Sequence, residues 1–572
     1  MSQASRASSS GRAVLGLMIA ALSLGLSPDA VRASGALEWG QCSPDLVDKY
    51  PELGDRLQCA ALRVPRDHHD PGKGKVALPM LRVLAGKPDQ RIGSLFVNPG
   101  GPGGSATGFA ASMGALFSMA DPAHPIARFQ RDIVDRYDIM AIEPRGLAGQ
   151  WLFKCRSNIA RKATESFDVD PGEANLANIE FNARLESSAC QNQPHAALIN
   201  TDQALRDMDL ARAAVGDARL NYFGVSYGTW LGAWYAATFP EHTGRMLLDS
   251  NMNWTGSFDE ALLDQPEAFQ RAFEETLIPF MASHPERFHL GSDPVKIIQD
   301  YRQVRPQLRS KNRFWALSAD NKQLEFSARV VAGVLLVERI LAAHPDIDLD
   351  ATLMHVDRYF DELGETDANA GIYAKNAARW HFSDNPPRPE QPFELEEEES
   401  VYRAVVCNDT SSQNDPDFWR SQMFAGSAQY SLRGGHGLQQ PCHDWALPVV
   451  EPRDFGAIAQ TEGLLMLQAS HDPITSSSGA MKAFDFTQNA RMIQVENNLT
   501  HGLFPQLTQC VDAKVADFLL EGTFPGRMTH CETPQPGEMS VAERSAQPYA
   551  DADRADLLRQ RMRELSTSKG LL

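Results

Sequence analysis

A single serine stands between two glycines in the segment LNYFGVSYGTWLGAWYAATFP, residues 220–240. The alternating bulky and β-branched residues before it predict a strand, and the small and aromatic residues after it predict a helix. At the apex of such a turn, Ser226 projects its hydroxyl above the sheet, where the first amides of the helix favour negative charge. The pattern Gly-x-Ser-x-Gly in this setting predicts that Ser226 is a nucleophile for acyl transfer. The alternative is a structural turn with an incidental serine.

A serine hydroxyl attacks only when a base takes its proton and an acid orients that base. The apolar run LLMLQAS leads to Asp472, and the run MIQVENNLT leads to His501, so both residues follow predicted strands. We therefore expect Asp472 as the acid and His501 as the base, in the chain order Ser, Asp, His. Asp249, which also ends a strand, is the competing acid, and His471 is the competing base. A structural histidine is the alternative for His501.

Acyl transfer also needs hydrogen-bond donors for the oxyanion. The glycine-rich loop NPGGPGGS, residues 98–105, follows a predicted strand, and its glycines allow backbone N–H groups to approach a substrate. We expect the donors to be the N–H groups of Gly101 and Tyr227. A phosphate-binding loop is the rival interpretation, but no Gly-Lys-Ser/Thr follows.

The elements around these residues predict the α/β class. Residues 91–250 contain short apolar runs that alternate with helical patterns, which indicates a mainly parallel central sheet with flanking helices, and we assign 37–250 to the first part of this α/β core. Residues 251–440 have helical periodicity and predict an inserted, mostly helical cap. The α/β pattern returns over 441–532, and 533–572 form a polar C-terminal extension. The cysteine spacing shows no metal site of the Cys-x-x-Cys kind, and we expect no metal and no cofactor.

The charge balance limits the partners. The chain has 572 residues and a formal net charge of −19, which argues against nucleic-acid binding because phosphate contacts need a basic surface. A cationic substrate or a free amino group is more compatible with this charge. The composition leaves the oligomeric state open.

The first 36 residues have the pattern of an export signal. Arg6 and Arg12 precede the apolar run 13–26, and Ala33 or Ala36 offers a cleavage site. The run is short for a membrane span, although an uncleaved anchor is the alternative. We expect an exported protein, secreted or periplasmic, with no stable membrane span after cleavage.

Eight cysteines agree with an oxidising compartment. An even count in an exported chain favours disulfides over buried free thiols, although many connectivities are open. Taken in order along the chain, the cysteines form the pairs Cys42–Cys59, Cys155–Cys190, Cys407–Cys442 and Cys510–Cys531.

Three motifs together resemble one family, the tripeptidyl aminopeptidase and proline iminopeptidase group of α/β-hydrolase serine exopeptidases. They are NPGGPGGS (98–105), YDIMAIEPRGLAGQ (137–150) and GVSYGTWLGAWYAATFPEHTGRMLLDS (224–250), and the HDPIT segment and the last cysteine pair also fit. The resemblance implies a secreted exopeptidase that removes short peptides from a free N-terminus. It further implies a cap that supplies carboxylates for the substrate ammonium, with Asp409 and Glu397 as candidates. Glu397 belongs to an acidic run, 394–399, whose alternative role is a solvated face.

Some positions depart from the family pattern. Glu143 replaces the usual aspartate before Pro-Arg-Gly, Ala106 stands where a glycine is common, and LAGQW lacks a common serine. None of these changes removes a triad residue. An esterase on the same fold and a catalytically inactive binding protein are the alternative functions, and the intact triad argues against the second.

Overall fold

The computed structural model describes residues 37–365, 371–383, 392–435, 442–505, 508–532 and 548–566. The predicted export signal and parts of the C-terminal extension lie outside these residues. All described residues belong to one unit, Leu37–Leu572.

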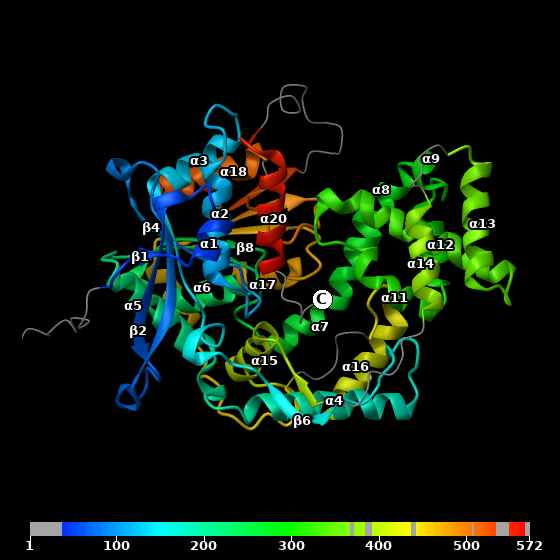
Figure 1. The fold of residues 1–572 in the computed structure, drawn as a ribbon, viewed down its shortest axis with the longest axis horizontal. Coiled ribbons are helices and arrows are strands. Elements are labelled where there is room, and N and C mark those ends of the chain that lie inside the picture. Colours follow the sequence, from blue (N-terminus) through cyan, green and yellow to red (C-terminus); the bar gives the residue numbers. More distant parts are fainter. Residues whose placement is uncertain are drawn as a thin grey trace, which may run out of the picture. The chain divides into compact units, whose positions relative to one another are not determined.

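A ten-stranded sheet forms the centre of the structure (Figure 1). Its order is β1-β2-β3-β5-β4-β7-β8-β10-β11-β12. The first four of these strands pair antiparallel, and the pairs from β5 and β4 onward are parallel. The strands span Gly40–Gln41 (β1), Leu57–Pro65 (β2), Lys75–Val83 (β3), Gly93–Asn98 (β4), Tyr137–Ile142 (β5), Leu220–Val225 (β7), Thr243–Asp249 (β8), Leu464–Ala469 (β10), Arg491–Glu496 (β11) and Met528–Glu532 (β12).

The parallel register places the predicted functional loops at one edge of the sheet. Asn98 at the end of β4 is opposite Gly224 in β7, and Val225 is opposite Asp249 in β8. Asp249 in turn is opposite Leu467 in β10. Since parallel strands end on the same side, the loops after these strands converge there.

Helices cover both faces of the sheet. One apolar core joins the sheet to α2, α3, α18 and α20, and a second core on the other face includes α5, α6 and α17. These helices span Ala106–Ser118 (α2), Ala127–Arg136 (α3), Thr201–Ala214 (α5), Tyr227–Thr238 (α6), Ser477–Phe486 (α17), Gln509–Ala516 (α18) and Ala552–Ser566 (α20), and the short α1 spans Pro44–Lys49.

The segment between β8 and β10 is mostly helical and supplies most of a third apolar core, which also includes Ile474 and Leu499. Figure 1 shows helices α12, α13 and α14 of this cap grouped together. Two elements from the first part of the chain join it: α4, Glu173–Gln191, contacts α15, and β6, Arg156–Ala160, pairs with β9, Pro392–Glu394. The cap helices span Phe258–Ala272 (α7), Ile278–Ala282 (α8), Pro285–Phe288 (α9), Pro294–Arg302 (α10), Pro306–Ala316 (α11), Leu324–Ala343 (α12), Leu349–Glu362 (α13), Ile372–Phe382 (α14), Glu397–Asp409 (α15) and Pro416–Gln429 (α16).

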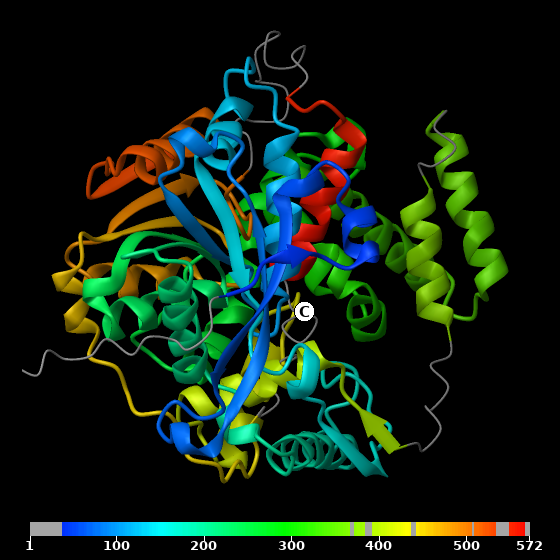
Figure 2. The ribbon, with the colours of Figure 1, turned by 60° about the vertical axis from the view of Figure 1, so that its left-hand side comes forward.

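The C-terminal extension contributes α20, which packs along α2, as the turned view also shows (Figure 2). The four sequential cysteine pairs are the four disulfides of the structure. Among the described residues, no helix combines the length and apolar character needed to cross a bilayer.

Candidate active site

The turn between β7 and α6 holds Ser226 in an unusual backbone conformation. Its φ of 59° and ψ of −124° lie where non-glycine residues are rare and where strain often accompanies function. The flanking glycines provide space: a Cβ on Gly224 would lie 2.4 Å from the carbonyl oxygen of Gly228, and one on Gly228 would lie 2.8 Å from that of Asn98. Glycine is therefore needed on both sides of Ser226 because strand, helix and the neighbouring β4 approach closely.

The glycine-rich loop after β4 lies directly against this turn. A Cβ on Gly100 would lie 3.0 Å from the backbone nitrogen of Tyr227, the first residue of α6. Gly101 borders the same cavity as Ser226. The two expected oxyanion donors, Gly101 and Tyr227, are thus on segments that touch each other beside the serine.

Glu143 fixes the helix that follows this loop. Its carboxylate accepts the backbone N–H of Thr107 at 2.8 Å and the Thr107 hydroxyl at 2.6 Å. Burial raises the pKa of Glu143. The longer side chain at this position therefore supports the first turn of α2 next to the oxyanion loop.

His501 and Asp472 form a buried pair. The Nδ1 atom of His501 lies 2.9 Å from Oδ2 of Asp472 and 3.2 Å from Oδ1, and both side chains are fully buried. Thr475, which the sequence analysis did not single out, donates its hydroxyl to Asp472 at 2.9 Å. The Nε2 atom of His501 is buried, and no hydrogen-bond partner for it is found within the described part of the chain. One ring nitrogen is thus oriented by a carboxylate and the other is available to a nucleophile.

The histidine loop and the serine turn are close neighbours. A Cβ on Gly502, next to His501, would lie 3.6 Å from Cγ1 of Val225, next to Ser226. His501 and Val225 also line one cavity. A hydrogen bond between Ser226 and His501 is not among those formed by the described residues, and such bonds often close only with substrate bound.

The competing acid and base are used elsewhere. Asp249 accepts the backbone N–H groups of Leu503 and Phe504, and burial raises its pKa to about 7. His471 has Nδ1 2.9 Å from the Thr276 hydroxyl and Nε2 2.9 Å from Glu275, both in the cap. The carboxylate of Asp249 and both ring nitrogens of His471 thus contact groups other than Ser226.

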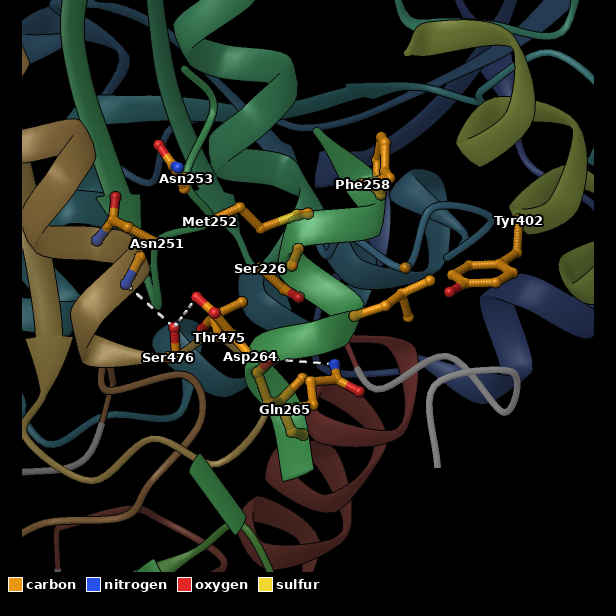
Figure 3. A pocket seen from close by; sticks show the side chains of 15 residues that line it. Ser226, Asn251, Met252, Asn253, Phe258, Asp264, Gln265, Tyr402, Thr475 and Ser476 are labelled. Atoms are coloured by element: carbon orange, nitrogen blue, oxygen red, sulfur yellow. Dashed lines mark hydrogen bonds between the residues drawn. The ribbon is translucent and has the colours of Figure 1, made fainter. Parts of the chain in front are cut away.

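Ser226 lines a cavity that is bordered by α7, α15 and the segment after Asp472. Among the described residues that line it, Asp264 of α7 is the one with a charged side chain (Figure 3). Its Oδ2 atom accepts a hydrogen bond from Ser476 at 3.2 Å. The rest of the lining is apolar or neutral and polar: Gly101, Asn251, Met252, Asn253, Phe258, Ala261, Leu262, Gln265, Tyr402, Ile474, Thr475, Ser476 and Gly479.

The two predicted ammonium-binding carboxylates do not line this cavity. Asp409 is 2 % exposed and accepts the backbone N–H of Thr201 at 2.8 Å as well as its hydroxyl. Glu397 lies at the start of α15 and pairs with Nζ of Lys154 at 3.2 Å. Both side chains are thus bonded to protein groups outside the cavity, whereas Asp264 lines it. No signal in the sequence distinguishes Asp264 from the other acids of α7.

The sheet order, the strained serine turn and the buried acid–base pair together define an α/β-hydrolase of the serine-hydrolase type. Family models agree with this: residues 161–323 match the α/β-hydrolase fold, and residues 430–531 match the family described as TAP-like protein. The chain has the α/β-hydrolase fold, and its C-terminal region is similar to the TAP-like family, as the sequence motifs predict.

Curated relatives match most of the chain. The tripeptidyl aminopeptidase of Streptomyces coelicolor is 26% identical, over 89% of this chain and 88% of that protein. Serine protease Hip1 of Mycobacterium tuberculosis is also 26% identical, over 86% of this chain and 91% of that protein. Carboxylesterase B of Mycobacterium tuberculosis is 27% identical, over 89% of this chain and 92% of that protein. The resemblance drawn from the three motifs is confirmed.

Proposed function

We propose that the protein is an exported serine aminopeptidase that releases single residues or short peptides, such as dipeptides and tripeptides, from free N-termini. The observation that supports this most directly is a strained serine in the same cavity as Asp264, the one carboxylate among the described lining residues, beside a buried histidine–aspartate pair. Relatives named as a tripeptidyl aminopeptidase and a serine protease support a peptide substrate. Four disulfides and the expected export signal favour a secreted or periplasmic location.

In the proposed mechanism, Oγ of Ser226 attacks the scissile carbonyl carbon while Nε2 of His501 takes the hydroxyl proton. The N–H groups of Tyr227 and Gly101 stabilise the oxyanion, assisted by the dipole of α6. His501 then gives the proton to the leaving amine, which leaves an ester between Ser226 and the N-terminal fragment. A water molecule, deprotonated by His501, hydrolyses this ester. Asp472 keeps the proton of the imidazole on Nδ1 throughout.

Asp264 is the proposed partner of the substrate ammonium. A carboxylate at a fixed place in the cavity pairs with the α-ammonium and so sets how far into the chain Ser226 cuts. An ester hydrolase has no use for this pairing. The effect of replacing Asp264 therefore distinguishes the peptidase from the esterase alternative. The carboxylesterase relative is the observation that supports the esterase.

The test compares Asp264→Asn with the unchanged protein on p-nitroanilides of mono-, di- and tripeptides, each with a free or acetylated N-terminus, and on p-nitrophenyl esters. We expect kcat/KM for the best free-amine peptide to fall about 10- to 100-fold, since a hydrogen bond to a charged group is worth roughly 1.5–3 kcal/mol. Ester cleavage should change little. Ser226→Ala should abolish turnover of every substrate and labelling by a fluorophosphonate.

Glu267→Gln is the matched control, because it removes the same charge from an exposed position on the same helix. Equal losses on free and acetylated peptides would show that Asp264 does not recognise the ammonium. Esters that are cleaved far better than every peptide would favour the esterase.

A further inference from the structure

The loop that carries His501, between β11 and α18, has a hydrogen-bond acceptor for each of six consecutive backbone N–H groups. Acceptors from the core hold the C-terminal side of the loop, and acceptors from the cap hold much of the N-terminal side. The bonds run from Leu499 to Oδ1 of Asn321 (2.9 Å), from Thr500 to Oδ1 of Asn498 (2.7 Å), from His501 to the carbonyl of Ala319 (2.9 Å), from Gly502 to Oγ of Ser250 (2.8 Å), and from Leu503 and Phe504 to Oδ1 and Oδ2 of Asp249 (3.0 and 2.8 Å).

The acceptors from the cap lie in one short segment, residues 317–323, between α11 and α12. Besides the two bonds that this segment accepts, its Asn321 donates a backbone N–H to Oγ1 of Thr500 at 3.0 Å. Three hydrogen bonds therefore connect the cap to the residues at and just before His501. The side chain of Asn321 makes one of them, and its main chain makes another.

The cap segment is itself tied to the rest of the molecule. Asp320 is 3 % exposed, accepts the backbone N–H of Lys322 at 2.9 Å, and lies 3.3 Å from Nη1 of Arg563 in α20. Helix α20 packs on α2, and the carbonyl oxygen of Leu565 lies 2.4 Å from where a Cβ on Gly104 would be. The C-terminal helix thus contacts both the oxyanion loop and the cap segment that holds the histidine loop.

We propose that the cap segment 317–323 positions the catalytic base, with Asn321 as its positioning residue, so that His501 is set in place jointly by the core and the cap. This inference rests on the proposed role of His501 as the base. A misplacement of about 1 Å in a reacting group is enough to lower a rate about 100-fold. The cap then has a role in catalysis itself, in addition to covering the cavity.

The test uses Asn321→Ala, which removes the acceptor for Leu499, and Asn321→Asp, which keeps an oxygen there. Both are measured on a free-amine peptide anilide and on a small p-nitrophenyl ester. For Asn321→Ala we expect kcat to fall about 10-fold or more on both substrates with KM nearly unchanged, because the base serves both reactions. Asn321→Asp should recover most of the loss. The rate at which a fluorophosphonate labels Ser226 should follow kcat.

A second pair, Thr500→Val and Thr500→Ser, tests the same connection if Asn321→Ala fails to fold. The valine should lower kcat, and the serine, which keeps the hydroxyl, should not. Asn376→Ala is the control, since Asn376 is also a cap asparagine but bonds Arg379 on its own helix. An unchanged kcat in Asn321→Ala and Thr500→Val, or a loss confined to the peptide, would overturn the inference. Activity that survives Ser226→Ala would instead refute the proposed mechanism.

Discussion

A buried carboxylate, Asp409, supports the first residue of the helix that follows Ser226. Asp409 bonds Thr201, and the hydroxyl of Thr201 lies 2.6 Å from that of Tyr227, the first residue of α6. Asp409 therefore supports the serine turn from behind. Burial raises its pKa to about 7, well above the usual range of an aspartate.

This raised pKa has a measurable consequence for stability. Between about pH 4 and pH 7 the folded protein holds a proton on Asp409 that the unfolded chain releases, so the contribution of Asp409 to stability falls as the pH rises through this range. Asparagine has no such dependence. When the pH is raised from 5 to 8, the free energy of unfolding of Asp409→Asn should therefore rise by about 1–3 kcal/mol relative to that of the unchanged protein. One pKa unit is worth about 1.4 kcal/mol.

Urea unfolding of the variant and of the unchanged protein at pH 5 and at pH 8 measures this difference in stability. The same variant should keep its KM for free-amine peptides. A large rise in KM would indicate that Asp409 binds the substrate ammonium after all. A stability difference that does not depend on pH would contradict the raised pKa.

Among the elements, the oxyanion loop depends on close packing against α15. A Cβ on Gly103, whose φ is +101°, would lie 2.3 Å from the carbonyl oxygen of Glu398 in the first turn of that helix. The backbone of the acidic run, 394–399, thus contacts the oxyanion loop at Glu398. Glycine is required there both for its conformation and for the space.

Gly103→Ala should therefore displace the oxyanion loop and lower kcat about 10²- to 10³-fold, the size of effect found when one oxyanion donor is lost. Gly216→Ala is a matched control, because Gly216 has a φ of +84° and no atom within 4 Å of an added Cβ. Steady-state kinetics and thermal unfolding of both variants provide the measurement. If the two alanines behaved alike, backbone strain rather than the contact with α15 would explain the effect.

For the whole molecule, the cap and the hydrolase core are joined by covalent as well as polar links. The disulfide Cys407–Cys442 connects α15 to the chain that leads back to the sheet, with a sequence separation of 35 residues. Polar links include the bonds of Asn321 and the ion pair between Asp320 and Arg563. Cap and core are therefore expected to unfold together under oxidising conditions.

Removing this disulfide in the double variant Cys407→Ala/Cys442→Ala should destabilise the protein by about 3–4 kcal/mol, because a loop of this length is released in the unfolded chain. Thermal unfolding with and without a reductant measures the effect. The reductant should lower the midpoint of the unchanged protein more than that of the variant. A midpoint that the double substitution leaves unchanged would show that this link adds nothing to stability.

Local sequence patterns alone predict which residues stand at the ends of the parallel strands. Ser226, Asp472 and His501 each follow an apolar run that forms a mostly buried strand, and the order of these runs along the chain fits one fold. Local patterns were therefore sufficient to predict these strands. The antiparallel strands β2 and β3 were not predicted, and they pair with each other and, through β3, with β5.

Which carboxylate lines the cavity of Ser226 depends on how the helices pack in three dimensions. Asp264, Asp409 and Glu397 all belong to helices, and helical periodicity does not specify which neighbour a face will meet. The same is true of Asn321, which lies far along the chain from His501 and meets its loop only because the cap folds back onto the core. Contacts between distant segments depend on how whole elements pack, and this information is spread over the entire chain.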